Sequence, residues 1–172
     1  MLGLVPDGEV STRKADNTPV VAWLKLPASY HCYDLRTGVD LGQGQTVPVT
    51  LDPQRATLVA ALPYTVDRVQ VKVRRTNPYG AFQVSAKIET LGGSSARHVF
   101  HLEISDAKGQ VLPYYTRNLV ADKGEWSGEL LLGLNEPAGN YRLTVRDVLS
   151  GKSAQGDLLK DLSQYASVIA PQ

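Results

Sequence analysis

The segment Val69–Arg74 reads VQVKVR, so valines and long polar side chains alternate in it without interruption. The segment Tyr141–Arg146 reads YRLTVR and repeats the pattern. Successive side chains of a strand point to opposite faces of a sheet, so each segment has one apolar face and one polar face. Two apolar faces buried against each other make a β-sandwich, and we therefore predict an all-β, sandwich-type fold.

The rest of the chain is punctuated in the manner of an all-β protein. Fifteen glycines and ten prolines separate short runs that are rich in Val, Thr, Leu and Tyr. Helix signals are scarce, and the spacing of the breaks is typical of sandwich strands and turns. Strands are predicted at Val20–Leu26, Tyr30–Asp34, Thr46–Leu51, Ala56–Leu62, Val66–Thr76, Phe82–Thr90, His98–Ser105, Leu112–Leu119, Trp126–Leu132 and Gly139–Val148.

The strands divide into two immunoglobulin-like sandwich units, with a boundary near Leu62–Asp67. Residues 1–65 are expected to form a small or incomplete sandwich, because so short a segment is thin for a core of its own. Residues 66–152 have the size and strand content of one immunoglobulin-like domain. Residues 153–172 are a tail in which Leu158, Leu159 and Leu162 have helical spacing. The tail is predicted to be a short helix, with a loosely ordered end as the alternative.

Two turns are predicted from their glycines. Asp34–Gly38 ends a strand with a glycine that tolerates positive φ. Asp106–Gly109 reads DAKG, which is typical of a hairpin built on a type I turn with a bulge.

The composition excludes several classes of protein. Hydrophobic residues make up 42% of the chain, and 18 Lys and Arg face 17 Asp and Glu. A net charge of +1 provides no field for nucleic acid or an anionic membrane. No apolar run approaches the about 18 residues that a spanning helix needs. Met1–Asp7 lacks the features of a signal peptide. Cys32 is the only cysteine, and we expect it to be a small buried hydrophobe.

Motifs of catalysis and cofactor binding are not found in the sequence. It has no nucleophile elbow, Walker loop or zinc-protease motif, so we expect no enzyme activity and no cofactor. A glycosidase needs two carboxyl groups on either side of a sugar, and sequence spacing cannot pair them in a sandwich. The single acids are interpreted as solvated strand or turn residues; they are Glu89, Glu103, Glu125 and Glu129.

No metal site is predicted. His98 and His101 are three apart, and on a strand they face opposite sides. The turn carboxylates Asp106, Asp122 and Asp147 are expected to cap turns rather than to bind calcium. The run Gly92–Ser95 is interpreted as a flexible loop, because no helix follows that would bind phosphate.

Aromatic side chains are the candidates for ligand binding. An exposed Trp or Tyr combines a large apolar face with a polar group, and sugar rings stack on such faces. The candidate residues are Trp126, Tyr114, Tyr115 and Tyr79. In the alternative interpretation, Trp126 and one of the tyrosines pack in the core. Trp23 lies in the continuous apolar run VVAWL and is predicted to be a core residue.

Two segments resemble parts of known families. The first contains CYDLRTG at Cys32–Gly38, a Leu-Gly pair, a strand, and an apolar strand that follows a proline turn and ends at Pro63. It is similar to the closing β-sandwich of bacterial glycoside hydrolases. The second segment is His98–Ala154, in which Gly139–Tyr141 opens the last long strand. It resembles an appended immunoglobulin-like domain of large secreted bacterial proteins. Macroglobulin-like modules have the same succession of strands and turns.

The resemblance implies a non-catalytic accessory region of a secreted carbohydrate-active protein, located outside the cell or in the periplasm. It carries over no catalytic residue. The partner that it implies is the catalytic domain of a parent protein, or a polysaccharide. The first interpretation of the role is a structural spacer or packing module. The alternatives are a carbohydrate-binding module that uses exposed aromatics, and a protein-interaction or adhesion module that uses a free sheet edge.

Overall fold

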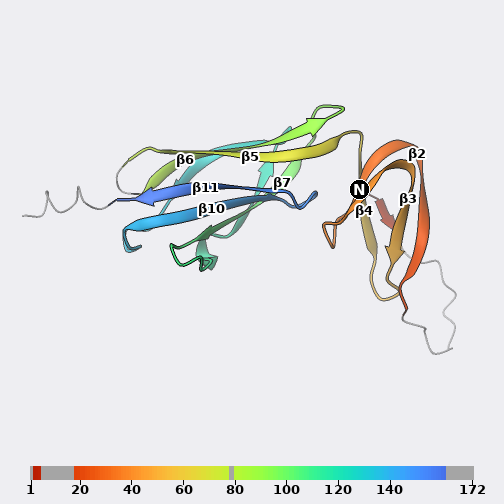
Figure 1. The fold of residues 1–172 in the computed structure, drawn as a ribbon, viewed down its shortest axis with the longest axis horizontal. Coiled ribbons are helices and arrows are strands. Elements are labelled where there is room, and N and C mark those ends of the chain that lie inside the picture. The colour runs from red at the N-terminus through yellow and green to blue at the C-terminus, as the bar shows by residue number, and fades with distance from the viewer. Residues whose placement is uncertain (1, 5–17, 78–79, 162–172) are drawn as a thin grey trace, which may run out of the picture. The chain divides into compact units, whose positions relative to one another are not determined.

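The computed structural model describes residues 2–4, 18–77 and 80–161, and these residues form an all-β protein (Figure 1). The prediction of an all-β fold is therefore confirmed. Among the described residues there is no helix long and apolar enough to cross a membrane. The strands are β1 (Leu2–Leu4), β2 (Val20–Asp34), β3 (Asp40–Leu51), β4 (Thr57–Leu62), β5 (Thr65–Arg75), β6 (Ala81–Leu91), β7 (His98–Ser105), β8 (Arg117–Ala121), β9 (Glu125–Leu131), β10 (Gly139–Asp147) and β11 (Ser153–Lys160). A 3₁₀ turn, η1 (Pro113–Tyr115), precedes β8.

The described residues group into two compact units. The first contains the described part of Met1–Val66 together with Thr90–Ser94 and Val148–Gly151, and the second contains the remainder. The chain therefore passes from the first unit to the second between Val66 and Asp67, while two short segments from later in the chain belong to the first unit.

The first unit is one four-stranded sheet in the order β1-β4-β2-β3. The long strand β2 pairs antiparallel with β3, with a register shift between Lys25 and Tyr30, whereas β4 pairs with β2 only at His31–Asp34. Alternate side chains of β2, β3 and β4 form one buried apolar cluster, made by Leu24, Leu26, Cys32, Val47, Val49 and Val59. Cys32 is fully buried, as its interpretation as a small hydrophobe predicts.

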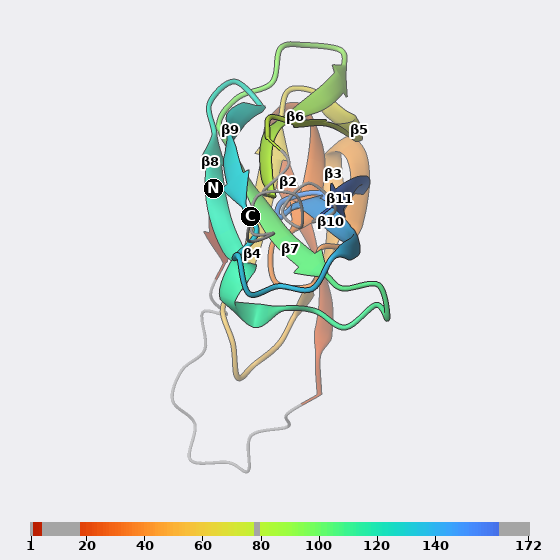
Figure 2. The same ribbon diagram turned by 90° about the vertical axis from the view of Figure 1, so that its left-hand side faces the viewer.

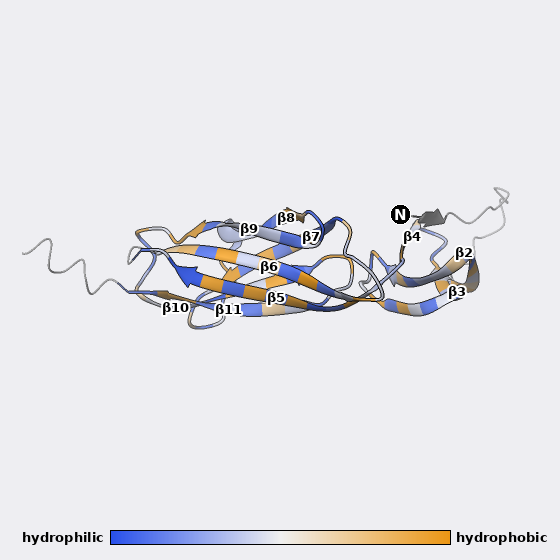
Figure 3. Cartoon of the chain, turned by 90° about the horizontal axis from the view of Figure 1, so that it is seen from above, coloured by the Kyte–Doolittle hydropathy of each residue, from blue (hydrophilic) through white to orange (hydrophobic). Residues whose placement is uncertain are grey.

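The second unit is built from two sheets, β11-β10-β7-β8 and β5-β6-β9. In Figure 2, β5 and β6 lie in one layer and β7 and β10 in the other. Apolar and polar bands alternate along these strands (Figure 3), and the apolar positions are the buried ones. The core of this unit contains Phe82, Val84, Phe100, Leu102, Ile104, Leu143, Val145 and Leu158.

Two predictions about secondary structure are wrong. Ser153–Lys160 forms strand β11 rather than a helix, because β10 offers it an antiparallel partner along its whole length; residues 162–172 of the predicted tail lie outside the described residues. Leu112–Leu119 is not one strand but η1 followed by β8. Pro113 lacks the N–H that a central ladder position requires and instead opens the 3₁₀ turn.

The two predicted turns are confirmed. Gly38 has φ +69° and donates its N–H to the carbonyl of Asp34 at 2.8 Å. Gly109 has φ +80°, and its N–H bonds the Asp106 carbonyl at 2.9 Å. Glycine adopts this left-handed backbone conformation without the Cβ strain of other residues. The loop Gly92–Ser95 leads to strand β7 and not to a helix, as predicted.

Candidate functional site

Tyr114 and Tyr115 lie on η1, where the turn brings both rings to one place. On a regular strand, neighbouring side chains would point to opposite faces. Here the two ring centroids are 4.8 Å apart, and the ring planes are tilted by 54°. The Tyr114 side chain is strongly exposed, at 67%, whereas Tyr115 is half-buried. The 3₁₀ turn that begins at Pro113 therefore creates an aromatic pair that the sequence pattern of a strand would have separated.

The carboxylate of Glu136 joins the two phenols. The hydroxyl of Tyr114 donates to Glu136 Oε1 at 2.7 Å, and that of Tyr115 reaches the same oxygen at 3.5 Å. The Tyr115 hydroxyl also accepts the N–H of Gly133 at 2.7 Å. The hydrogen bond to Glu136 raises the pKa of Tyr114 to about 12, and burial raises the pKa of Tyr115. The raised pKa keeps the Tyr114 hydroxyl protonated, and a donor to Glu136, to a higher pH than in an ordinary tyrosine.

Lys160 holds the loop that carries Glu136 in place. Only 1% of Lys160 is exposed. Its Nζ donates to the carbonyls of Gly133 and Glu136 at 2.6 Å each and to that of Leu134 at 3.2 Å. A buried ammonium is stable only where hydrogen bonds replace its water, and these three carbonyls do so. Lys160 thereby sets the position of the loop, and with it the carboxylate that holds both tyrosines.

A hollow of about 280 Å³ opens beside the tyrosines. Aromatic faces, a guanidinium and a carboxylate meet there, so the hollow offers an apolar platform together with hydrogen-bond donors and acceptors. Its lining residues are Tyr114, Tyr115, Thr116, Arg117, Glu129, Leu130 and Leu131. We call the group formed by Tyr114, Tyr115, Arg117, Glu129 and Glu136 the tyrosine site.

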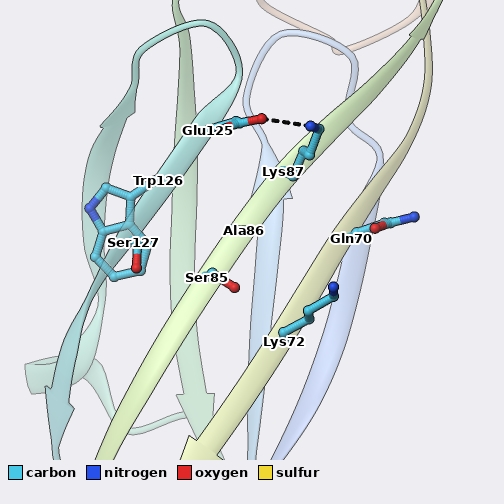
Figure 4. Close-up of a pocket in the computed structure, with 8 residues that line it drawn as sticks. All are labelled: Gln70, Lys72, Ser85, Ala86, Lys87, Glu125, Trp126 and Ser127. Atoms are coloured by element: carbon cyan, nitrogen blue, oxygen red, sulfur yellow. Dashed lines mark ion pairs between the residues drawn. The ribbon is translucent and has the colours of Figure 1, made fainter.

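Trp126 does not belong to the tyrosine site. It is half-buried on β9 opposite Ala86, and its ring covers Gly128, where an added Cβ would lie 2.6 Å from Cζ2. It borders a different hollow, of about 310 Å³, on the β5-β6-β9 sheet. In Figure 4 the indole lies on the side of β9 away from Lys87. The sequence-predicted set is thus split, with the tyrosine pair in one place and Trp126 in another.

The second hollow is lined mainly by polar side chains. Lys87 Nζ and Glu125 Oε1 form an ion pair at 2.6 Å, the dashed line of Figure 4. The hydrogen bond from Lys87 lowers the pKa of Glu125. Both side chains are more than half exposed, so water screens the pair and it contributes little to stability. The remaining lining residues are Gln70, Lys72, Ser85, Ala86 and Ser127.

The other two aromatic predictions have different outcomes. Tyr79 lies outside the described residues. The prediction that Trp23 is a core residue is wrong, since its side chain is 69% exposed. The run VVAWL is apolar at every position, so it shows no alternation from which to tell the inner face. In the structure Leu24 and Leu26 take the buried positions, and Trp23 falls on the opposite face.

Among the described residues, no group of three or more His, Cys, Asp and Glu is suited to hold a metal ion. His98 and His101 lie on opposite faces of β7, as predicted. Asp106 caps its turn through the N–H groups of Lys108 and Gln110, both at 2.9 Å.

Asp147 differs from its prediction as a turn cap. It ends β10 as a buried carboxylate whose Oδ1 lies 2.9 Å from His98 Nδ1. Asp122 instead accepts a hydrogen bond from Arg97 at 2.8 Å.

Two other single acids, Glu89 and Glu103, are in contact with neighbouring side chains. Glu89 contacts Arg68 and Gln70, and Glu103 contacts His101 at 3.2 Å. Each of these acids is thus a partner in a surface or half-buried contact on its own sheet.

A hydroxyl, an imidazole and a carboxylate lie in contact in the first unit. Thr65 Oγ1 is 2.9 Å from His31 Nδ1, and His31 Nε2 is 2.8 Å from Asp40 Oδ1. The imidazole also lies against the ring of Tyr33, with centroids 4.8 Å apart. Because both ring nitrogens are occupied, the arrangement fixes the imidazole beside the buried Tyr33.

The residues that sequence reasoning missed are Glu136, Lys160 and Arg117. Glu136 lies in a loop more than twenty positions from the tyrosines that it binds, at separations of 21 and 22. Lys160 falls in the tail that the sequence predicts to be helical. The sequence contains one usable signal for Lys160. This lysine follows the apolar Leu158 by two positions, so on a strand both side chains lie on the same face.

No family model and no curated protein matches this chain. Among solved structures, it is similar to Bacteroides uniformis beta-glucuronidase 2 covalently bound to cyclophellitol-6-carboxylate aziridine, with 12% identity and a TM-score of 0.32. It is also similar to Bacteroides uniformis beta-glucuronidase, with 11% identity and a TM-score of 0.30. Each alignment covers 81% of this chain and 26% of the other, so the chain spans about a quarter of their length. Likeness at this level carries no argument about ligand or activity.

Proposed function

We propose that this chain is a non-catalytic accessory region of a larger carbohydrate-active protein, and that its second unit binds saccharide at the tyrosine site. Its setting is then extracellular or periplasmic, where polysaccharides are met. The sequence resemblance to sandwich regions of glycoside hydrolases supports the setting. The observation that carries the binding role is the strongly exposed Tyr114 ring, whose hydroxyl is held by Glu136 at 2.7 Å.

The chemistry of the tyrosine site suits a sugar ring. A pyranose has an apolar face of C–H groups and a rim of hydroxyls, and an aromatic ring with polar neighbours complements both. Arg117 offers donors and Glu129 offers an acceptor beside the Tyr114 face. Because Glu136 and the Lys160-bound loop already hold the rings, little side-chain entropy is lost on binding. A site whose rings are held in place in this way is suited to binding a sugar rather than to cleaving one.

The carboxylate of Glu136 has a positioning role in this proposal. Its Oε1 accepts hydrogen bonds from both phenols, so this oxygen is engaged in holding the two rings. We therefore expect the isolated chain to release no reducing sugar from polysaccharides. Release that is abolished by Glu129→Gln or Glu136→Gln would show an active glycosidase and overturn the non-catalytic part of the proposal.

Binding can be measured by affinity electrophoresis and calorimetry of the whole chain against soluble β-glucan, xylan, galactomannan and pectin. Tyr114→Ala should weaken binding at least tenfold, which corresponds to about 1.4 kcal/mol. Tyr114→Phe keeps the ring and should retain most of the affinity. Val120→Ala is the matched control, because Val120 is a 57% exposed apolar residue outside the hollow lining and outside the loop that carries Glu136. Equal binding by wild type and Tyr114→Ala, or no binding to any of the four, would overturn the saccharide role and leave the structural-spacer interpretation.

A further inference from the structure

The outer face of the first unit carries a second aromatic surface. Val20, Val21 and Trp23 are exposed at 61%, 63% and 69%. They stand at the start of β2, where the neighbouring Leu24 and Leu26 are buried in the cluster beneath. In the part of the chain that the structure describes, no ring contact or hydrogen bond joins the Trp23 indole to another side chain. A large apolar face is thus presented to solvent on a strand that its own core holds in place.

The strand register shows what surrounds Trp23. Pro48 of β3 is its direct cross-strand partner. Opposed residues of an antiparallel pair have side chains on the same face, about 5 Å apart. The surface that we call the Trp23 platform consists of Val21, Trp23 and Lys25 of β2 with Thr50, Pro48 and Thr46 opposite them on β3. All six are exposed.

The size of the platform limits what it can bind. Its apolar exposed area, with that of Val20, is on the order of 350 Å², about half of it from one indole. A stable protein interface buries about 800 Å² on each partner, roughly twice as much. The polar residues of the platform are also interleaved with the apolar ones, since hydroxyls of Thr46 and Thr50 flank Pro48. A small area with hydroxyls on both sides fits pyranose rings better than it fits a protein face.

We infer that the Trp23 platform is a second saccharide-binding surface, on which one sugar ring stacks on the indole. Neighbouring sugar hydroxyls then bond Thr46, Thr50 and the Lys25 ammonium. This inference takes its ligand class from the proposed function but uses residues of the other unit. The two sites can therefore fail independently, and the experiment separates them.

Fluorescence gives a direct measure, because Trp23 and Trp126 are the only tryptophans. In the Trp126→Phe variant, emission reports Trp23 alone, and it should be red-shifted and readily quenched by acrylamide. Soluble polysaccharides that bind the whole chain should shift this emission to the blue and lower the quenching constant at least twofold. No change at saturating polysaccharide would overturn the inference. A blue shift that follows protein concentration without saccharide would overturn it as well, since it would show a self-association surface.

Affinity measurements separate the two sites. Trp23→Ala should weaken polysaccharide binding at least fivefold, and the double variant with Tyr114→Ala should lose it. Val120→Ala, an exposed strand valine on β8 at 57%, is the control and should bind like wild type. If Tyr114→Ala abolishes binding and Trp23→Ala has no effect, the platform is refuted while the tyrosine site stands. If only Trp23→Ala matters, the platform stands and the tyrosine site is refuted. Unchanged thermal unfolding of Trp23→Ala confirms that a loss of binding is not a loss of fold.

Discussion

Replacing Lys160 with methionine tests the interactions that hold the tyrosine site together. Methionine keeps the length and most of the volume of the lysine stem, so packing is largely preserved while the ammonium is removed. Three backbone carbonyls, those of Gly133, Leu134 and Glu136, then lose their donor. The bond to Leu134, at 3.2 Å, is the longest of the three and therefore the weakest. The two bonds of 2.6 Å carry most of the effect.

The expected size follows from opposing terms. A hydrogen bond from a charged donor contributes about 1.5–3 kcal/mol, so the two short bonds together contribute about 3–6 kcal/mol. Removing the ammonium also relieves the cost of keeping a cation out of water, which is several kcal/mol before its hydrogen bonds offset it. We therefore expect Lys160→Met to lower the free energy of unfolding by about 3 kcal/mol. Substitution of exposed residues seldom changes stability by more than about 0.5 kcal/mol.

Urea unfolding followed by Trp126 fluorescence, in a Trp23→Phe background, measures the second unit. Lys72→Met is the matched control, because Lys72 is an exposed strand lysine without an ion pair to any described residue. If the free energy of unfolding of Lys160→Met lies within about 0.5 kcal/mol of the parent, the hydrogen bonds to the carbonyls have no net stabilising effect. If the variant is more stable than the parent, burial of the ammonium destabilises the fold. In addition, Lys160→Met should weaken saccharide binding, because the loop that bears Glu136 loses its anchor.

Three further changes have defined outcomes. His98→Ala removes a hydrogen-bond partner from the fully buried Asp147 and should cost about 3 kcal/mol in urea unfolding, whereas a cost below about 0.5 kcal/mol would contradict this. Burial raises the pKa of the Cys32 thiol, so a disulfide reagent at pH 8 should label it only after unfolding, and rapid labelling of the folded chain would oppose its burial. The folded-state pKa of Tyr114 is raised from 10.0 to about 12, so the stability from its bond to Glu136 is complete below pH 10 and is lost as the pH rises toward 12. Wild type should therefore lose more stability than Tyr114→Phe over that interval, and parallel losses would show that the bond has no effect.

Much of the fold is predictable from local pattern. The alternation of Val69–Arg74 and Tyr141–Arg146 correctly indicates strands with one buried face, and the strand predicted at His98–Ser105 is found with the same bounds. Turn glycines such as Gly38 and Gly109 mark their positions by the positive φ that they adopt. These features depend on neighbours in sequence, which is why a sequence pattern contains them.

The failures are those that depend on distant partners. Ser153–Lys160 has residues at helical spacing, but the free edge of β10 supplies a ladder of hydrogen bonds that a helix cannot use. The continuous apolar run around Trp23 predicts burial but does not indicate which of its alternate side chains face inward. Packing against the buried cluster places Leu24, and not Trp23, on the inner face. Local propensity is overridden by tertiary context in both cases.

The candidate site was predictable only as a pair of adjacent tyrosines. Its geometry depends on Pro113, which replaces a strand by a 3₁₀ turn and so turns both rings to one side. Its charge depends on Glu136, which tertiary folding brings to Tyr114 from a loop 22 positions away. The sequence spacing reveals neither feature. The sequence therefore indicates tyrosines as candidate ligand-binding side chains but does not indicate the geometry of the site.

The tyrosine site and the Trp23 platform are held rigid in different ways, and this bears on how each would bind. Tyr114 is positioned by a chain of hydrogen bonds that ends at the buried Lys160, so its binding should weaken whenever that chain is cut. Trp23 is positioned by the β2–β3 ladder and the cluster under it, with no polar contact of its own among the described residues. Its binding should therefore depend on the fold of the first unit and not on any single hydrogen bond. In both places the backbone that carries the ring is held before a ligand arrives, and at Tyr114 the hydrogen bond to Glu136 also holds the side chain, so little of the gain from stacking is lost in ordering the backbone.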